Sequence, residues 1–217
     1  GFTSLNLDLM FALPDQSLYA WKQNLTRALA LKPEHLSLYC LTIEQNTAFY
    51  KKHLKGQLNL PDDETQVAMY DDCVQRTGEL GLTQYEISNF AKPGYECRHN
   101  LCYWHGEVYA GYGPGAVGSI PGEAFGVPTA DQVRYTNLKH PDLYCQAVEA
   151  QKPIYFEHEP LGDETLTTER IMLGLRLNEG VPKELLRANV SKVANLVARD
   201  WIFEQDGRVA LTSLGRH

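Results

Sequence analysis

The sequence of 217 residues lacks the features that mark membrane, secreted and nucleic-acid-binding proteins. It has no run of about eighteen apolar residues, the length that a membrane-spanning helix needs. It does not open with a basic segment followed by an apolar one, as a secretory signal would. Positive charge is not in excess either, because 20 lysines and arginines stand against 27 acidic residues, for a net charge of −7. This balance argues against general binding to nucleic acid or acidic membranes, and we expect a cytoplasmic protein.

Cysteine is scarce, and its spacing does not suit a disulfide framework. The five cysteines are odd in number and mostly far apart, as expected in a reducing compartment: Cys40, Cys73, Cys97, Cys102 and Cys145. An initiator methionine is also absent, and a strand pattern begins almost at once, at Leu5–Phe11. We therefore expect that a natural N-terminal portion precedes this sequence.

The first ninety residues alternate between strand and helix patterns. Apolar alternation or continuous apolar runs predict strands, and 3.6-residue periodicity between capping signals predicts helices. The predicted strands are Leu5–Phe11, His35–Ile43 and Thr83–Phe90, and the predicted helices are Ser17–Leu31 and Asp62–Leu80. This order predicts parallel strands joined by right-handed crossovers, as in the later half of a (β/α) barrel. Three strands cannot close a barrel, which again indicates preceding sequence.

The rest of the chain changes in character. Turns, aromatic residues and glycines follow Lys92, and a helix is predicted near Pro141–Ala150. From about Leu161, three helical segments precede two short strands around the turn Asp206-Gly207, a pattern that predicts a winged-helix-like unit. The eight acidic and eight basic side chains of 163–217 argue against a DNA-binding wing. The expected domains are residues 1–122, a connecting segment 123–160, and residues 161–217.

Carboxylates near strand ends are the first candidates for chemistry, because barrels of this kind place their active sites at the carboxyl ends of the strands. Asp8, Thr42 and Glu86 lie in such positions. Asp8 could accept a hydrogen bond from a ligand or form a salt bridge, and Glu86 could equally pair with Arg98. The glycines of Ala110–Gly122 could let a ligand approach the backbone, or could simply form a tight turn.

The segment "ECRHNLCYWHG" (Glu96–Gly106) has the highest density of ligand-type side chains. Three interpretations are open. Cys97, His99, Cys102 and His105 have the ligand types for zinc, although their spacing is tighter than in common zinc motifs. His99 could be an axial heme ligand beside the flat surfaces of Tyr103 and Trp104. The aromatic pair could also be core, with His99 hydrogen-bonded beneath it.

Four segments in order carry a resemblance to a known family: "NLDLMFALPDQS", "HLSLYCLTIE", "QYEISNFAKPGYECRHNLCYW" and "GYGPGAVGS". They resemble the radical S-adenosylmethionine proteins related to oxygen-independent coproporphyrinogen III oxidase, and most of all the HemW-type heme-chaperone branch. The segment "MLGLRLNEGV" (Met172–Val181) extends the likeness into the C-terminal part. The resemblance implies an α/β fold: the later part of a radical S-adenosylmethionine (β/α) partial TIM-like barrel, followed by a small helical, winged-helix-like C-terminal domain.

The resemblance also implies the site residues. The heme-chaperone branch carries an H-N-x-x-Y-W motif implicated in heme binding, which raises the heme interpretation above the zinc and core ones. Its matching positions here are His99, Asn100, Tyr103 and Trp104, with His99 as the expected ligand of the heme iron. Asp8 matches a family aspartate that contacts S-adenosylmethionine, and Thr42 and Val117 match further contacts. No catalytic residue is expected in this chain.

The family's [4Fe-4S] cluster is held by three cysteines in a C-x3-C-x2-C-type motif, and no three cysteines here have that spacing. We expect those ligands to lie outside this chain, which alone should neither assemble the cluster nor cleave S-adenosylmethionine. The implied function is part of a heme chaperone that delivers heme to acceptor hemoproteins, with membrane proteins among the candidate acceptors. The alternatives are oxidative decarboxylation of coproporphyrinogen III in heme biosynthesis, and a zinc-stabilised structural module.

Overall fold

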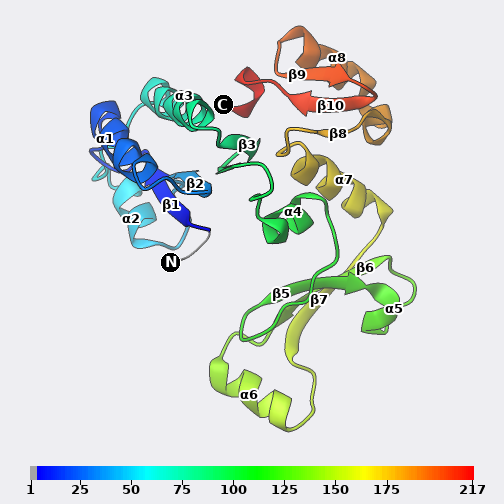
Figure 1. The fold of residues 1–217 in the computed structure, drawn as a ribbon. Helices are drawn as coiled ribbons and strands as arrows, with labels where there is room; N and C mark the ends of the chain where they lie inside the picture. Colours follow the sequence, from blue (N-terminus) through cyan, green and yellow to red (C-terminus); the bar gives the residue numbers. More distant parts are fainter. Residues whose placement is uncertain (1–3) are drawn as a thin grey trace. The chain divides into compact units, whose positions relative to one another are not determined.

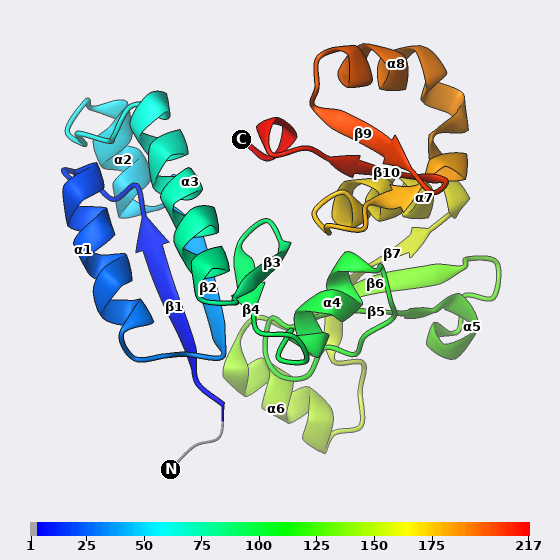
Figure 2. The same ribbon diagram turned by 45° about the horizontal axis from the view of Figure 1, so that its top comes forward.

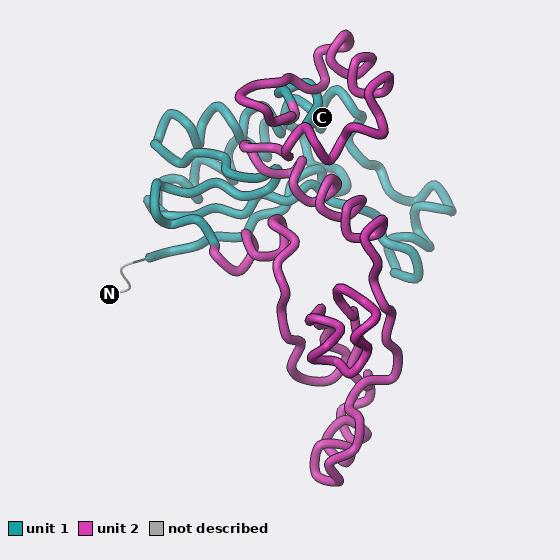
Figure 3. Tube along the Cα trace, turned by 90° about the vertical axis from the view of Figure 1, so that its right-hand side faces the viewer, with its two compact units in different colours: residues 1–97, 212–217 teal, residues 98–211 magenta. Residues whose placement is uncertain are grey.

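The computed structural model describes residues 4–217 and divides into two compact units (Figure 3). Unit 1 contains the residues up to Cys97 together with Thr212–His217, and unit 2 contains Arg98–Leu211. Among the described residues, no helix is long and apolar enough to cross a membrane. The domain boundaries expected at residues 122 and 160 stay a prediction.

Unit 1 is a four-stranded sheet with helices (Figure 1). Its strands, in sheet order, are β1 (Asn6–Phe11), β2 (His35–Cys40), β4 (Asn89–Ala91) and β3 (Thr83–Glu86). Its helices are α1 (Leu18–Leu29), α2 (Ala48–Leu54) and α3 (Asp63–Glu79). Strands β1 and β2 are parallel, with Asp8 opposite Ser37. The parallel pair and its crossover helix confirm the first half of the predicted pattern.

Helices α1 and α3 lie side by side along the sheet (Figure 2). Both begin at a side-chain cap: the Ser17 hydroxyl accepts from the N–H of Ala20, and Asp62 accepts from the N–H of Thr65. Their apolar stripes and one face of the sheet form the core of unit 1, whose largest members are Trp21, Leu25, Leu36, Met69 and Phe90. The opposite face of the sheet carries the polar residues Asn6 and Asp8 of β1. On this face the side chains of β1 are exposed, whereas their neighbours His35 and Ser37 on β2 are buried.

The single strand predicted over Thr83–Phe90 is wrong. These residues form two antiparallel strands, β3 and β4, and β4 lies antiparallel to β2. The chain turns at Ile87–Ser88, where the Glu86 carboxylate accepts hydrogen bonds from the Ser88 N–H at 2.8 Å and from the Asn89 side chain at 2.5 Å. The Glu86 carboxylate thus accepts the hydrogen bonds that stabilise the turn, and the turn divides into two strands a segment whose apolar pattern favours one. Strand β2 is also shorter than predicted, and helix α2 lies between β2 and α3, where no helix or strand was predicted.

The last six residues pack onto unit 1. The Arg216 guanidinium donates to the Gln84 side chain at 2.8 Å, and the imidazole of His217 lies 3.0 Å from the Asp71 carboxylate. The His217 ring also meets the edge of Tyr70, at 5.6 Å between centroids. The chain is therefore fixed to α3 and β3 at this point.

Unit 2 contains two small sheets and several helices. One sheet has antiparallel strands in the order β5 (Val117–Pro121), β6 (Gln132–Asn137) and β7 (Tyr155–Leu161), and the other has the order β8 (Val181–Pro182), β10 (Arg208–Leu211) and β9 (Ile202–Gln205). The helices are α4 (Arg98–Trp104), α5 (Gly122–Phe125), α6 (Pro141–Glu149), α7 (Asp163–Gly174), α8 (Val190–Ala198) and the 3₁₀ helices η1 (Lys183–Asn189) and η2 (Leu214–Arg216), the last in the part of the chain that joins unit 1.

The C-terminal part of unit 2 follows the predicted winged-helix-like pattern. Helix α7, helix η1 and helix α8 precede the β9–β10 hairpin, which turns at Asp206-Gly207. Its own core is formed by Val181, Val193, Ile202 and Val209. None of these residues belongs to the core of unit 1.

The thiol of Cys73, on α3, should resist alkylation in the folded protein. Cys73 is buried, and desolvation raises the pKa of its thiol to about 12. The reactive thiolate is therefore scarce at pH 8, the reverse of the depressed pKa of reactive cysteines. We expect iodoacetamide at pH 8 to modify exposed Cys145 in the native protein, and to modify Cys73 only after denaturant is added. Peptide mass spectrometry measures both, and equal native labelling of the two would contradict the buried position.

Candidate functional site

Helix α4 carries the H-N-x-x-Y-W segment. His99 and Tyr103 are four residues apart and so share one face of the helix. Their rings meet edge to face at 4.9 Å between centroids, and Tyr103 meets Tyr109 in the same way at 4.7 Å. Tyr109 is fixed in turn by paired backbone hydrogen bonds with Ser119 of β5. The result is a row of three rings that ends at an imidazole.

His99, at the end of this row, is exposed. Within residues 4–217, neither of its ring nitrogens has a hydrogen-bond or ion-pair partner. The interpretation in which His99 is hydrogen-bonded beneath an aromatic core is therefore wrong. An imidazole without a hydrogen-bond partner, beside flat aromatic rings, is a ligand that heme iron takes from proteins. These residues fit heme.

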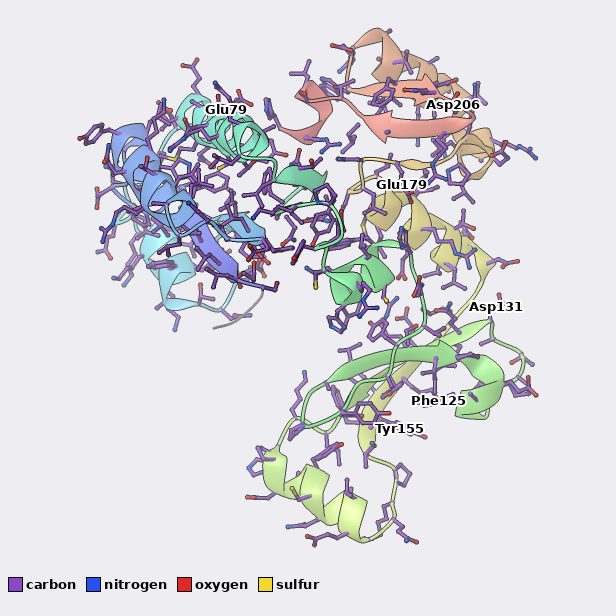
Figure 4. All side chains as sticks on the ribbon, viewed as in Figure 1. Glu79, Phe125, Asp131, Tyr155, Glu179 and Asp206 are labelled. Carbon is purple, nitrogen blue, oxygen red and sulfur yellow. The ribbon has the colours of Figure 1, made fainter. Side chains whose placement is uncertain are left out.

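Trp104 and His105, at the C-terminal end of α4, are held by the turn after α7. The Arg176 guanidinium lies over the Trp104 ring, 4.3 Å from its centroid. Glu179, labelled in Figure 4, lies 3.2 Å from Nε2 of His105. Arg208 of β10 donates to the carbonyls of Glu179 and Gly180, each at 2.7 Å, and so fixes the turn. Sequence reasoning missed these partners, because no spacing rule relates them to α4.

The indole N–H of Trp104 is a further feature that fits a ligand. It is buried and has no acceptor among the described residues. Buried donors in folded proteins are nearly always satisfied, so this N–H marks a place where a water, an ion or a bound molecule would supply the acceptor. Heme carries two propionates that have this chemistry. Asn100 lies on the same helix and is half-buried.

The structure does not support the zinc interpretation. Across residues 4–217, no three His, Cys, Asp or Glu side chains form a group that could hold a metal ion. The physical reason lies in the neighbours of Cys102 and His105. His105 pairs with Glu179, while a hydrogen bond from Cys102 to Glu107 raises the pKa of that thiol and disfavours the thiolate that zinc requires. Cys97 precedes the helix and is not on its face.

Asp8 lies in the middle of β1, on the polar face of the sheet, and is exposed. One of its oxygens accepts a hydrogen bond from the Asn6 amide at 2.8 Å. Thr42 is also exposed and follows the end of β2, where the N–H of Leu41 still bonds to Phe11 at the end of β1. Asp8 is thus on β1 and Thr42 lies just beyond the end of the adjacent parallel strand β2, and Asp8 keeps acceptor capacity for the hydroxyl or amino group of a ligand.

Val117 begins β5 in unit 2 and is 40% exposed. The glycine run before it is held by side chains: Asn137 donates to the carbonyls of Gly111 and Gly113 at 3.1 and 3.0 Å, and the Tyr144 hydroxyl accepts from the N–H of Gly113. Gly113 has a φ of +97°, which explains its identity. The run is thus a built scaffold that presents Val117 and not only an open turn.

The residues present do not fit an iron–sulfur cluster. Such a cluster needs at least three thiolates in one place, and among residues 4–217 the metal-ligand side chains form no group of that size. Cys73 is buried in the core of unit 1, and the remaining cysteines lie on separate elements or segments. No chemistry of a cluster is therefore assigned to this chain.

Comparison with known proteins identifies relatives over the whole chain. It is 36% identical over 217 residues to the heme chaperone HemW of Mycobacterium tuberculosis (strain CDC 1551 / Oshkosh), matching 100% of this chain and 53% of that protein. It is 38% identical over 225 residues to HemW of Bacillus subtilis (strain 168), matching all of this chain and 57% of that protein. Residues covering 82% of the chain are 36% identical to radical S-adenosyl methionine domain-containing protein 1, mitochondrial, of Danio rerio, and match 39% of it. No family model matches.

A solved structure has the same fold. The coproporphyrinogen III oxidase HemN of Escherichia coli, described as a radical SAM enzyme, aligns with a TM-score of 0.71 at 18% sequence identity, over 100% of this chain and 53% of that one. The α/β fold of this chain is therefore that of the part of HemN with which it aligns, as predicted. By sequence, the chain is similar over its whole length to proteins named heme chaperone HemW, and it spans about half the length of the curated relatives it matches.

Proposed function

We propose that this chain is the heme-binding part of a radical S-adenosylmethionine heme chaperone. The observation that carries the proposal is His99, an exposed imidazole without a partner among the described residues, which stands at the end of a row of aromatic rings. His99 would ligate the heme iron, while Tyr103 and Trp104 would supply flat apolar surface. Asn100 would contribute a polar contact from the same helix. The name of the relatives, heme chaperone HemW, supports the same function.

In the whole protein, Asp8, Thr42 and Val117 would contact S-adenosylmethionine. A [4Fe-4S] cluster, whose ligands we propose lie outside this chain, would bind that cofactor and supply electrons. Asp8 suits this role because its carboxylate keeps acceptor capacity on the polar face of the sheet. The partners would be heme and acceptor hemoproteins, and we propose a cytoplasmic location.

The test is a heme titration of the full-length protein followed by its Soret absorption. We expect saturable binding in the wild type and an affinity at least tenfold lower in His99→Ala, which corresponds to about 1.4 kcal/mol. His53→Ala is the matched control, because His53 is another exposed helical histidine, and it should bind heme as the wild type does. Equal binding by His99→Ala and wild type would overturn the assignment of the iron ligand.

A second assay separates the chaperone from an enzyme. Full-length protein with its cluster reconstituted should transfer heme to an apo-hemoprotein, and should not convert coproporphyrinogen III to protoporphyrinogen IX. Conversion by the wild type would favour the oxidase, whose fold this chain shares.

A further inference from the structure

A chain of hydrogen bonds runs across unit 1 from Asp8 to the residue that precedes α4. Asn6 donates to Asp8 at 2.8 Å, and its carbonyl oxygen lies 2.6 Å from Nδ1 of His35. Nε2 of His35 lies 2.9 Å from the hydroxyl of Tyr85. That hydroxyl accepts from the backbone N–H of Cys97 at 3.3 Å, and Arg98, the next residue, begins α4. The function proposed above uses Asp8 at one end of this chain of hydrogen bonds and none of its other members.

The chain has one direction, which its chemistry imposes. The Asp8 carboxylate can only accept, so Asn6 must direct its NH₂ group toward Asp8 and its carbonyl toward His35. His35 must then carry its proton on Nδ1, which leaves Nε2 as an acceptor for the Tyr85 O–H. The Tyr85 oxygen in turn accepts from the N–H of Cys97. Every donor thus points toward Asp8, and the charge of Asp8 sets the tautomer of a histidine that it does not touch.

Burial maintains the neutral imidazole that this arrangement requires. His35 is 6% exposed, and desolvation lowers its pKa against the opposing effect of Asp8, Glu86 and Glu96. Its ring also packs against Tyr85, at 5.7 Å between centroids. If both ring nitrogens of His35 were protonated, Nε2 could no longer accept a hydrogen bond from the Tyr85 hydroxyl. Nε2 would instead donate to the Tyr85 oxygen. The hydrogen bonds of His35, together with the burial that lowers its pKa, thus favour one tautomer of the neutral ring.

We propose that His35 is a positioning residue that couples the occupancy of Asp8 to the start of the α4 helix. A ligand hydroxyl or amino group that donates to Asp8 competes with Asn6 for the carboxylate. The ligand thereby weakens the hydrogen bond from Asn6 to Asp8. That hydrogen bond orients Asn6, and through it His35 and then Tyr85. The Cys97 N–H loses part of its anchor, and the segment that leads into His99 is released. The proposal rests on the proposed function only in naming the two ligands, a nucleoside at Asp8 and heme at His99.

The tautomer of His35 is the direct test, and it requires neither heme nor cluster. Long-range ¹H–¹⁵N spectra of full-length protein labelled with ¹⁵N-histidine distinguish Nδ1–H from Nε2–H, and His35→Gln assigns the signal. We expect Nδ1–H in the wild type, and a shift toward Nε2–H in Asp8→Asn, where Asn6 is no longer held in one orientation. An Nε2–H tautomer in the wild type, or no response to Asp8→Asn, would overturn the proposal.

The coupling is measured by heme titration of cluster-reconstituted full-length protein with and without saturating S-adenosylmethionine. We expect the heme affinity to change by about fivefold in the wild type, within the range of ordinary coupling between sites. Tyr85→Phe keeps the ring and removes the hydroxyl, so it should abolish the change, whereas Tyr50→Phe on α2 should retain it. An unchanged affinity in the wild type, or coupling that survives Tyr85→Phe, would overturn the proposal.

These outcomes separate the two claims. If His99→Ala binds heme as the wild type does, the proposed function fails at its ligand, and the tautomer measurement still decides the role of His35. If His99 is the ligand but His35 carries its proton on Nε2, the positioning role fails alone.

Discussion

Gly111→Ala is expected to destabilise unit 2 by about 3 kcal/mol, the upper range for a side chain that has no room. A Cβ at this position would lie 2.4 Å from the carbonyl oxygen of Val117 and 2.6 Å from its carbonyl carbon. These are backbone atoms of β5, so no rotamer change can relieve the contact. The peptide at Gly111 is also fixed on both sides, since its N–H donates to the Tyr135 hydroxyl and its carbonyl accepts from Asn137. The strain must therefore displace Val117.

This substitution should also weaken the binding of S-adenosylmethionine, because Val117 is a proposed contact for that cofactor. Denaturant unfolding gives the loss of stability, and equilibrium binding to cluster-reconstituted protein gives the loss of affinity. Gly162→Ala is the control in the same unit: its Cβ would meet nothing within 4 Å, and because Gly162 is the N-cap of α7, where alanine is less favourable than glycine, the cost should be about 1 kcal/mol or less. Wild-type stability and affinity in Gly111→Ala would show that the run is not rigid.

Local signals predicted most of the elements that position the site. Helices α1 and α3 begin at Ser17 and Asp62 because these side chains satisfy free N–H groups, and such caps are visible in the sequence. The turn at Asp206-Gly207 is equally local, with both residues at positive φ. Where a structure depends on a side chain and its near neighbours in the chain, the sequence predicts it.

The β3–β4 hairpin is a feature that the apolar pattern of Thr83–Phe90 did not predict. A run of eight residues with strand propensity favours one strand, and only the position of Glu86 decides against it. Its carboxylate is fully buried and takes the N–H of Ser88 out of the sheet ladder. A carboxylate in the middle of a strand pattern is itself evidence for a turn at that point. Burying an unpaired carboxylate would cost more free energy than a continuous strand would contribute.

The candidate site likewise combines contacts that local sequence patterns predict with contacts that they do not. The four-residue spacing of His99 and Tyr103 places them on one helical face, and that contact follows from the sequence once α4 is known to be a helix. The arginine over Trp104 comes from a turn more than seventy residues away, and no local rule predicts it. Val117 is similar, since the side chains that fix its glycine run come from β6 and α6. Long-range polar contacts therefore complete what local patterns begin.

Separate cores should make the two units unfold separately when one of them is weakened. Leu25 is fully buried in the core of unit 1, and Ile202 is 5% exposed in that of unit 2. Truncation of either to alanine removes the same kind of side chain and is expected to cost about 2–5 kcal/mol. The paired variants differ only in the unit that they affect, so each is the control for the other.

Hydrogen exchange followed by mass spectrometry reads the two units independently. Leu25→Ala should speed exchange of the protected amides in α1 and α3 and leave those of α8 and β9 as in the wild type, whereas Ile202→Ala should do the reverse. The reason is that local opening is governed by the core that an element packs against, and these cores share no residue. An equal rise in both units for either variant would mean that 4–217 unfolds as one cooperative body. In that case a change at Asp8 would reach α4 through global stability as well as through His35, and Leu25→Ala would alter the coupling between S-adenosylmethionine and heme as strongly as Tyr85→Phe.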